Sequence, residues 1–404
     1  MTCRGEPSCK FATENQLNNM KRKISILLLL CSMVSIPSLF AADKSGTTAI
    51  EECPVKEIVA KYYPRNLFVG MATQHRLINT LSVKIADREF GYITPANDFK
   101  QSYIHPEPDK WQWSRPEEFL SHCTSNGQLL RVHGPISPQC SHWARDDQRT
   151  PEELSVMLEE FFTALCMRIA SSPQVRWMDV VNETICKNRL TCKKYGVYNA
   201  GDWFGPRQGN KTWENPWLTL GTEEFEGEQY PLYIRRAFEI SNRLAPSVKQ
   251  IINQDSKLAP TFAEWEKMKK LVGYLRAKGL RVDGIGWQAH IDTGLEKDPR
   301  KLAYLNNFID WCHKNRLEFH ITEMNVWINE GDDEKKQAAT FKAVFDTVLP
   351  HSANGTIGIC FWNVRDEDTD KADRKGTLWR NDGTPRPAYF ALRESLIQNA
   401  INKF

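Results

Sequence analysis

Two glutamates stand at the ends of short apolar segments, where a carboxylate can take part in acid–base chemistry. Glu183 follows the run from Val175 to Val181, whose apolar and β-branched residues are typical of a strand buried on both faces. Glu323 follows a similar run that begins at Leu317. Taken alone, a glutamate in such a place is more often a solvated loop residue or a helix cap. Two of them in the same setting indicate acid–base chemistry in one pocket.

Strand-like and helix-like segments alternate along the rest of the chain and would position these glutamates. The expected strands cover residues 66–70, 89–94, 128–133, 175–181, 248–253, 282–290, 318–322 and 356–362, and the expected helices cover residues 116–123, 151–170, 231–244, 262–278, 300–315, 334–349 and 387–400. This alternation predicts an α/β fold, a (β/α)8 TIM barrel that forms a single catalytic domain with long βα loops. The Gly-, Pro- and Trp-rich passage from 184 to 229 is expected to be irregular and to form a pocket wall.

The C-terminal ends of barrel strands form one face, on which polar side chains are predicted to meet. Besides the two glutamates, the residues at these strand exits are Asn97, Lys100, His133, Asn182, Gln288, His290 and Trp362. Each has an ordinary alternative, since a lysine can be a solvated loop residue and a histidine a hydrogen-bonded structural one. The convergence of all of them on one face favours a binding pocket.

Composition excludes several classes of protein. With 404 residues, 41% hydrophobic and 25% charged, the chain can bury a large core without covalent cross-links. A net charge of +3 and the lack of a long basic run beyond the first residues argue against a nucleic-acid partner. The 13 tryptophans suit stacking on sugar rings, although core packing accounts for many of them. No CxxC pair occurs, so a zinc site is not expected. We also expect no other metal site and no cofactor.

The N-terminal region predicts export. Residues 20–42 contain a basic Lys21-Arg22-Lys23 segment, an apolar run and small residues before Asp43, which is the pattern of a signal peptide. A membrane anchor is the alternative, but the run is shorter than the ~20 residues that a span needs. Residues 1–19 resemble a non-native leader before the true start at Met20. The domain from 43 to 404 is therefore expected to be secreted or periplasmic, free of the membrane after cleavage, and monomeric.

An oxidising compartment permits disulfides. Cys186 and Cys192 lie six residues apart in a loop-like stretch and form the best candidate pair. Cys166, Cys312 and Cys360 lie in apolar runs and are expected to be buried free thiols.

Several motifs occur together in a fixed order. They are Asn97 to Lys100, Arg131 to His133, Asp179 to Glu183, Gly284 to His290, Ile321 to Asn325 and Arg386 to Tyr389. In this order they resemble glycoside hydrolase family 10, the retaining endo-1,4-β-xylanase family with a (β/α)8 barrel. The resemblance runs from about Asn66 to the C-terminus.

The resemblance implies roles for the residues at the strand exits. Glu323 would be the nucleophile and Glu183 the general acid/base of a double displacement on a polysaccharide or oligosaccharide. Asn182 would bind the sugar 2-hydroxyl, and Gln288 and His290 would orient Glu323. The remaining side chains would bind the glycone, namely Asn97, Lys100 and His133 through hydrogen bonds and Trp362 by stacking.

The chain also departs from the family pattern. Residues 134–138 replace a segment that carries a Trp and a His, Asn325 replaces an Asp, and Asn363 replaces a Gly. A wider glycone pocket is therefore expected, with replacement contacts from Trp203, Trp213 or Trp217. Two alternatives stay open: a retaining glycosidase of the same barrel that acts on another β-glycan, and a non-catalytic carbohydrate-binding protein, against which the intact glutamate pair argues.

Overall fold

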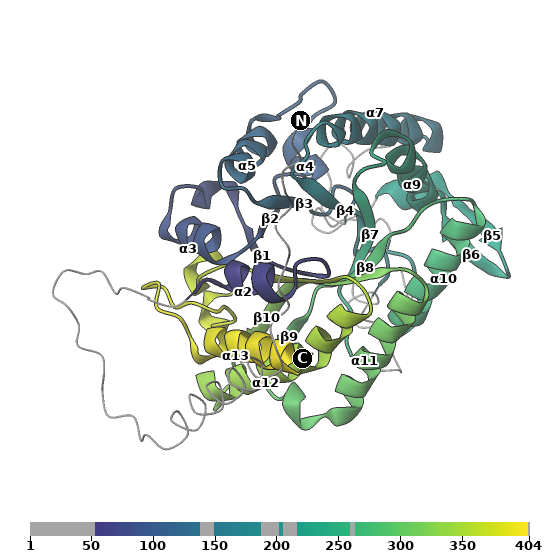
Figure 1. Ribbon diagram of the computed structural model, residues 1–404. Helices are drawn as coiled ribbons and strands as arrows, with labels where there is room; N and C mark the ends of the chain where they lie inside the picture. Colours follow the sequence, from purple (N-terminus) through teal and green to yellow (C-terminus); the bar gives the residue numbers. More distant parts are fainter. Residues whose placement is uncertain (1–52, 138–148, 187–201, 205–215, 259–262, 403–404) are drawn as a thin grey trace, which may run out of the picture. The chain divides into compact units, whose positions relative to one another are not determined.

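Parallel β-strands alternate with helices in the computed structural model, which describes residues 53–137, 149–186, 202–204, 216–258 and 263–402. The barrel strands are β1 (Leu67–Thr73), β2 (Tyr92–Pro95), β3 (Leu129–Val132), β4 (Val175–Asn182), β7 (Lys249–Gln254), β8 (Gly284–Trp287), β10 (Glu318–Trp327) and β11 (Ile357–Trp362). They pair in chain order, and β11 pairs with both β10 and β1, so the sheet closes on itself (Figure 1). The predicted (β/α)8 barrel is confirmed.

A ring of helices surrounds the barrel (Figure 1). They are α2 (Val55–Tyr62), α3 (Leu81–Glu89), α4 (Gln101–Ile104), α5 (Ser114–Ser125), α7 (Pro151–Ala170), α9 (Leu232–Leu244), α10 (Ala263–Ala277), α11 (Pro299–Lys314), α12 (Glu334–Val348) and α13 (Pro387–Ile401). Each expected helix is present, and Thr150 caps α7 in a capping box with Glu153. The sequence analysis missed α2, α3 and α4, which are 8, 9 and 4 residues long and so show too few turns for a clear period.

The expectation of an irregular passage from 184 to 229 is wrong for its last part. A 3-10 helix spans Pro216–Leu220, and β5 (Thr222–Phe225) and β6 (Glu228–Pro231) form an antiparallel hairpin. Tyr230 stacks on Tyr274 of α10 at a ring-centroid distance of 4.2 Å, which fixes the hairpin to the helical ring. The hairpin strands are only four residues long, too short for their alternation to be recognised.

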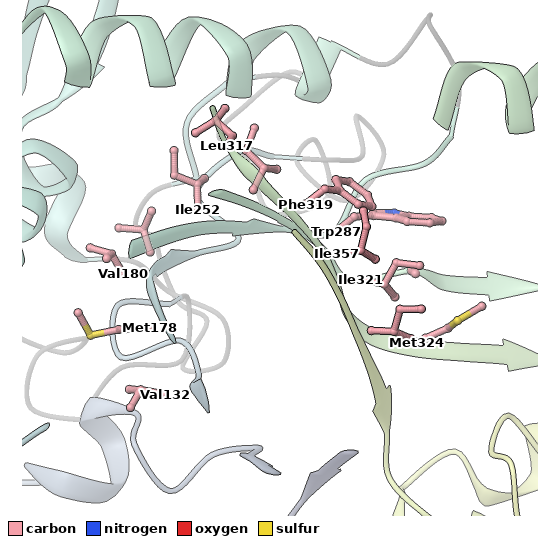
Figure 2. Close-up of a cluster of buried hydrophobic side chains, with 14 of the residues drawn as sticks. Val132, Met178, Val180, Ile252, Trp287, Leu317, Phe319, Ile321, Met324 and Ile357 are labelled. Atoms are coloured by element: carbon pink, nitrogen blue, oxygen red, sulfur yellow. The ribbon is translucent and has the colours of Figure 1, made fainter. Parts of the chain in front are cut away.

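Hydrophobic side chains from the strands and helices pack into the main core. Figure 2 shows part of it, where Val180 of β4, Ile252 of β7 and Phe319 of β10 lie with their neighbours. A smaller cluster is formed by strand residues, including Tyr92, Trp177 and Cys360. Together these clusters hold the strands rigidly and so fix the positions of the strand ends.

Irregular pairing occurs where the site residues leave the barrel. The register of β4 against β7 shifts between Asp179 and Val181, and that of β10 against β11 shifts between Ile321 and Met324. Such bulges re-aim the side chains that follow them. The single strand expected over 282–290 is instead divided into β8 and β9 (His290–Asp292), because Ala289 has a φ of 59° that no regular strand can accommodate.

The cysteines follow the expectations where the structure describes them. Cys186 is disulfide-bonded, whereas its expected partner Cys192 lies outside the described residues. Cys166, Cys312 and Cys360 are free and buried, as predicted. In the described part of the chain, no helix has the length and apolar character needed to cross a membrane.

Candidate active site

A cleft of about 1490 Å³ lies over the C-terminal ends of the barrel strands. Its lining includes eight of the nine predicted site residues: Asn97, Lys100, His133, Glu183, Gln288, His290, Glu323 and Trp362. The ninth, Asn182, is 3% exposed and lies beneath them in hydrogen-bond contact. The structure therefore brings all nine together, from six different strand exits.

Three of the strand exits carry a residue other than glycine with a left-handed backbone. The φ angle is 52° at Glu183, 59° at Ala289 and 68° at Asn363. Left-handed backbone costs an L-residue about 1–2 kcal/mol, so packing around these residues must maintain it. At Glu183 the turn ends β4 and directs the carboxylate into the cleft. At position 363 the family pattern has a glycine, and asparagine is among the residues that tolerate this conformation best.

One chain of hydrogen bonds joins the two glutamates. Gln288 Nε2 donates to Glu183 Oε1 at 2.9 Å and to Asn182 Oδ1 at 3.2 Å. The expectation that this side chain orients Glu323 is therefore wrong, because it contacts Glu183 instead. Asn253 Nδ2 donates to the same Asn182 oxygen at 2.9 Å and to Glu323 Oε1 at 3.0 Å. The two carboxylates are thus held in one network of amides that carries no further charge.

Asn253 is the main site residue that the sequence analysis did not select. Thr322 Oγ1 donates to its Oδ1 at 2.7 Å, so the amide oxygen faces Thr322 and both hydrogens of Nδ2 face the acceptors. A Cβ at Gly286 would lie 2.3 Å from that oxygen, which explains why glycine is needed there. Asn253 ends the predicted strand over 248–253, so the strand-exit rule could have found it.

Basic neighbours and burial act in opposite directions on the pKa of the nucleophile candidate, Glu323. Burial of Glu323 would raise its pKa, but His133, His290 and Lys100 outweigh this effect, and its pKa is lowered. His133 Nε2 lies 3.7 Å from Oε1 and His290 Nε2 lies 3.3 Å from Oε2. Glu323 is therefore an ionised carboxylate at neutral pH, as a nucleophile must be.

Lys100 supplies a cation at the cleft wall. It is 6% exposed, and burial lowers its pKa, while the charges of Glu323 and Glu183 act to raise it. Its backbone N–H donates to the carbonyl oxygen of Asn97 at 2.9 Å, which closes the turn that presents both side chains. A lysine and an amide on one turn can bind adjacent hydroxyl groups of a sugar.

His133 is held from below by a buried ion pair. Its Nδ1 lies 2.9 Å from Oδ2 of Asp179, which also accepts from Arg131. Arg131 and Asp179 are fully buried, and Arg131 together with His133 outweighs the effect of burial and lowers the pKa of Asp179. This contact fixes the ring of His133 with Nε2 directed at Glu323.

Trp362 is half-buried in the cleft, and the rings of His133 and His290 meet it edge to face. An indole in this position offers a flat apolar face to a sugar. The other tryptophans expected to contribute do not. Trp203 and Trp217 are 7% and 1% exposed and belong to the main core, so that expectation is wrong for both. Trp213 and Pro138 lie outside the described residues.

Comparison with known proteins accounts for this arrangement. The model of glycosyl hydrolase family 10 matches residues 57–395. The chain belongs to this family. It is therefore a glycoside hydrolase, as the two glutamates and the resemblance predicted.

Individual relatives agree with the family assignment. The endo-1,4-beta-xylanase B of Thermotoga neapolitana is 25% identical over 390 residues, which cover 93% of this chain and 97% of the relative. The structure of native xylanase 10B from Thermotoga maritima, at 25% identity, superposes with a TM-score of 0.69 over 86% of this chain and 99% of that one. Xylanase 10B from Thermotoga petrophila RKU-1 in complex with xylobiose, at 24% identity, gives 0.70 over 86% and 98%.

Proposed function

We propose that this family 10 enzyme hydrolyses a β-1,4-linked polysaccharide of the xylan type, with retention of configuration. One observation carries the proposal. Glu183, which follows β4, and Glu323, which lies within β10, face the same cleft and are joined by the amides of Gln288, Asn182 and Asn253. Relatives named as xylanases, and a xylobiose complex of one structural neighbour, support the choice of polysaccharide.

The proposed reaction is a double displacement. Glu323 attacks the anomeric carbon while Glu183 protonates the departing glycosidic oxygen, so that a glycosyl ester forms on Glu323. Glu183 then takes a proton from a water molecule, whose oxygen attacks the same carbon and releases Glu323 as a carboxylate. Gln288 holds Glu183, and Asn253 with His290 holds Glu323 throughout.

The stereochemistry of the first product tests this mechanism. ¹H NMR of a xylan digest, recorded before mutarotation, should show the β-anomer of the new reducing end first. Initial formation of the α-anomer would mean inversion and would exclude the ester on Glu323.

A second β-glycan remains a candidate because the exit of β3 differs from the family pattern. Gly134 follows His133 with a φ of 52°, and Ser137 is 3% exposed, so the described residues after His133 contribute no large side chain to the cleft. A wider glycone pocket would favour a substituted or hexose-based chain. Catalytic efficiency on linear xylo-oligosaccharides compared with that on substituted and hexose-based β-glycans decides between the two.

Export from the cytoplasm is part of the proposal and is supported by the basic and apolar segments of residues 20–42. The mature enzyme should begin near Ala42 or Asp43. Mass spectrometry of protein recovered outside the cytoplasm tests this start, and an intact N-terminus on the exported protein would contradict it.

A further inference from the structure

His290 lacks a hydrogen-bond partner on the side of its ring that faces away from Glu323. Its Nδ1 is buried, and no described residue offers it a donor or an acceptor. Its Nε2 lies 3.3 Å from Oε2 of Glu323. A proton on Nδ1 would be a buried donor without an acceptor, whereas a proton on Nε2 is directed at a carboxylate. The surroundings therefore select the tautomer that carries its proton on Nε2.

The neighbouring strand does not hold the ring by a hydrogen bond either. Asn325 pairs in register with His290, where β9 runs beside β10. Its Nδ2 donates instead to the backbone oxygens of Trp362, at 2.8 Å, and Gly376, at 3.4 Å. Hydrogen bonding at Nδ1 therefore does not keep the imidazole from tilting.

Two aromatic rings contact the imidazole of His290: Trp362 meets it edge to face, and Trp327 stacks on it. The Trp327 ring is stacked on the imidazole with a centroid distance of 5.6 Å and an angle of 8° between the planes. A stacked, nearly parallel ring resists tilting of its neighbour, because tilting would open a gap on one side and a clash on the other. The stack therefore keeps the plane of the imidazole, and with it the direction of the Nε2–H bond.

The indole is itself firmly placed. The Trp327 carbonyl oxygen accepts from the Thr293 backbone N–H at 3.0 Å. Lys371 Nζ lies 4.4 Å and the Arg374 guanidinium 5.0 Å from the Trp327 ring centroid, so two cations cover the ring. A Cβ at Gly376 would lie 2.5 Å from Cδ1 of Trp327, which shows how closely the backbone fits the ring.

We propose that Trp327 is a positioning residue that holds His290 by stacking, in place of a hydrogen bond at Nδ1, so that the Nε2 proton stays directed at Glu323. The importance of this contact for catalysis rests on the proposed function, in which Glu323 is the nucleophile. The position of the His290 ring does not depend on the proposed function. Two measurements therefore separate the two claims.

The first measurement is the tautomer of His290, read from ¹H–¹⁵N NMR correlations of the imidazoles and assigned with His290→Gln. Wild type and Trp327→Phe should show one tautomer, protonated on Nε2. Trp327→Leu should show exchange between tautomers. Trp111→Leu is the matched control, because Trp111 stacks on another histidine, His105, at 4.0 Å and lies outside the cleft lining. A proton on Nδ1 in wild type, or an unchanged tautomer in Trp327→Leu, would overturn the proposal.

The second measurement is the rate at which 2,4-dinitrophenyl 2-deoxy-2-fluoro-β-xylobioside inactivates the enzyme. This probe needs attack by Glu323 but little help from Glu183, because its leaving group is activated. We expect Trp327→Leu to be inactivated at least tenfold more slowly at saturation, with an unchanged dissociation constant for the probe, and Trp327→Phe to retain the rate.

The two claims can fail separately. A loss in Trp327→Leu that is confined to the dissociation constant would show that Trp327 binds sugar directly, and would overturn the positioning role. Failure of the wild type to form an adduct would refute the proposed function instead, while the tautomer measurement would still decide the position of the ring.

Discussion

Asn253 donates a hydrogen bond of 3.0 Å from its Nδ2 to Oε1 of Glu323. The same nitrogen donates to Asn182, the residue next to Glu183, so one amide sets the position of the nucleophile candidate relative to that of the acid/base candidate. A neutral donor suits this place. It stabilises the Glu323 carboxylate less strongly than an ion pair with a cation in direct contact would. In the proposed reaction, such an ion pair would have to be broken when the glycosyl ester forms.

Asn253→Asp should therefore reduce activity far more than the small change in side-chain size suggests. It would put a second carboxylate about 3 Å from Glu323, where two like charges cannot both ionise. We expect kcat/KM at neutral pH to fall by roughly 10²-fold or more, as after the loss of one preorganised donor, and the acidic limb of the pH profile to move to higher pH. Thr322→Val is the control, since it removes only the bond to Oδ1 and keeps the Nδ2 group and both of its acceptors. Equal losses in the two variants would contradict the bridging role.

Glu183→Gln should separate substrates by their leaving groups. Natural polysaccharide needs protonation of a poor leaving group, whereas a dinitrophenyl glycoside does not. The variant should lose roughly 10²- to 10⁴-fold in kcat on polysaccharide and much less in the first step on the activated substrate. Rates from stopped-flow release of dinitrophenolate check this, and a similar loss on both substrates would remove Glu183 from the role of acid.

Glu323→Ala should be inactive on both substrates, because no glycosyl ester can form. Azide fills the space left by the carboxylate and can attack the anomeric carbon of a dinitrophenyl β-glycoside directly. The bond to dinitrophenolate then breaks in one displacement, and the product is the α-glycosyl azide. Product analysis by NMR should show this anomer. Formation of the β-azide would mean that another group in the cleft is the nucleophile.

Lys100→Met should move the acidic limb of the pH–activity profile to higher pH. Lys100 is one of the cations that lower the pKa of Glu323 against the effect of burial. Its removal should raise that pKa, so Glu323 would be protonated, and activity lost, at a higher pH than in wild type. A pH profile of kcat/KM measures the shift. Lys301→Met is the control, because Lys301 lines the same cleft but pairs with Asp298. No movement of the limb in Lys100→Met, or the same movement in both, would contradict the assignment.

The strands and most helices could be predicted because apolar runs and period-3.6 patterns are local properties of the sequence. The registers could not be predicted, since bulges such as the one between Asp179 and Val181 arise from pairing with distant strands.

The strand-exit rule brought together the nine predicted residues and should also have selected Asn253. Trp327 could not be selected from the sequence, because the expected strand ended at 322, whereas β10 continues to 327. Trp203 and Trp217 were misjudged, since an aromatic residue between glycines and prolines can fill a core as well as a cleft.

The opposite end of β10 supports the last prediction, which concerns stability alone. Glu318 begins this strand, and its side chain is 12% exposed. Its Oε2 accepts from Trp177 Nε1 at 2.9 Å and lies 3.0 Å from His320 Nε2. Burial would raise the pKa of Glu318, but these contacts and Lys249 outweigh it and lower the pKa from 4.5 to about 2. Burial also lowers the pKa of His320, so that ring acts at neutral pH as a hydrogen-bond donor rather than as a charge.

Glu318→Gln should therefore reduce the free energy of unfolding at pH 7. The full pKa shift would correspond to about 3 kcal/mol at about 1.4 kcal/mol per pH unit, and we expect about 2 kcal/mol because His320 is neutral. A carboxyl group with a lowered pKa stabilises the folded state above its unfolded pKa. The difference between variant and wild type should accordingly be constant above pH 5 and shrink as the pH falls from about 4.5 to about 2. Urea unfolding across this pH range measures the difference in the free energy of unfolding.

Glu394→Gln, on the exposed face of α13, is the control and should stay within about 0.5 kcal/mol of wild type at every pH. A difference for Glu318→Gln that persists unchanged to pH 2 would show that the variant disturbs packing rather than the ionised carboxylate.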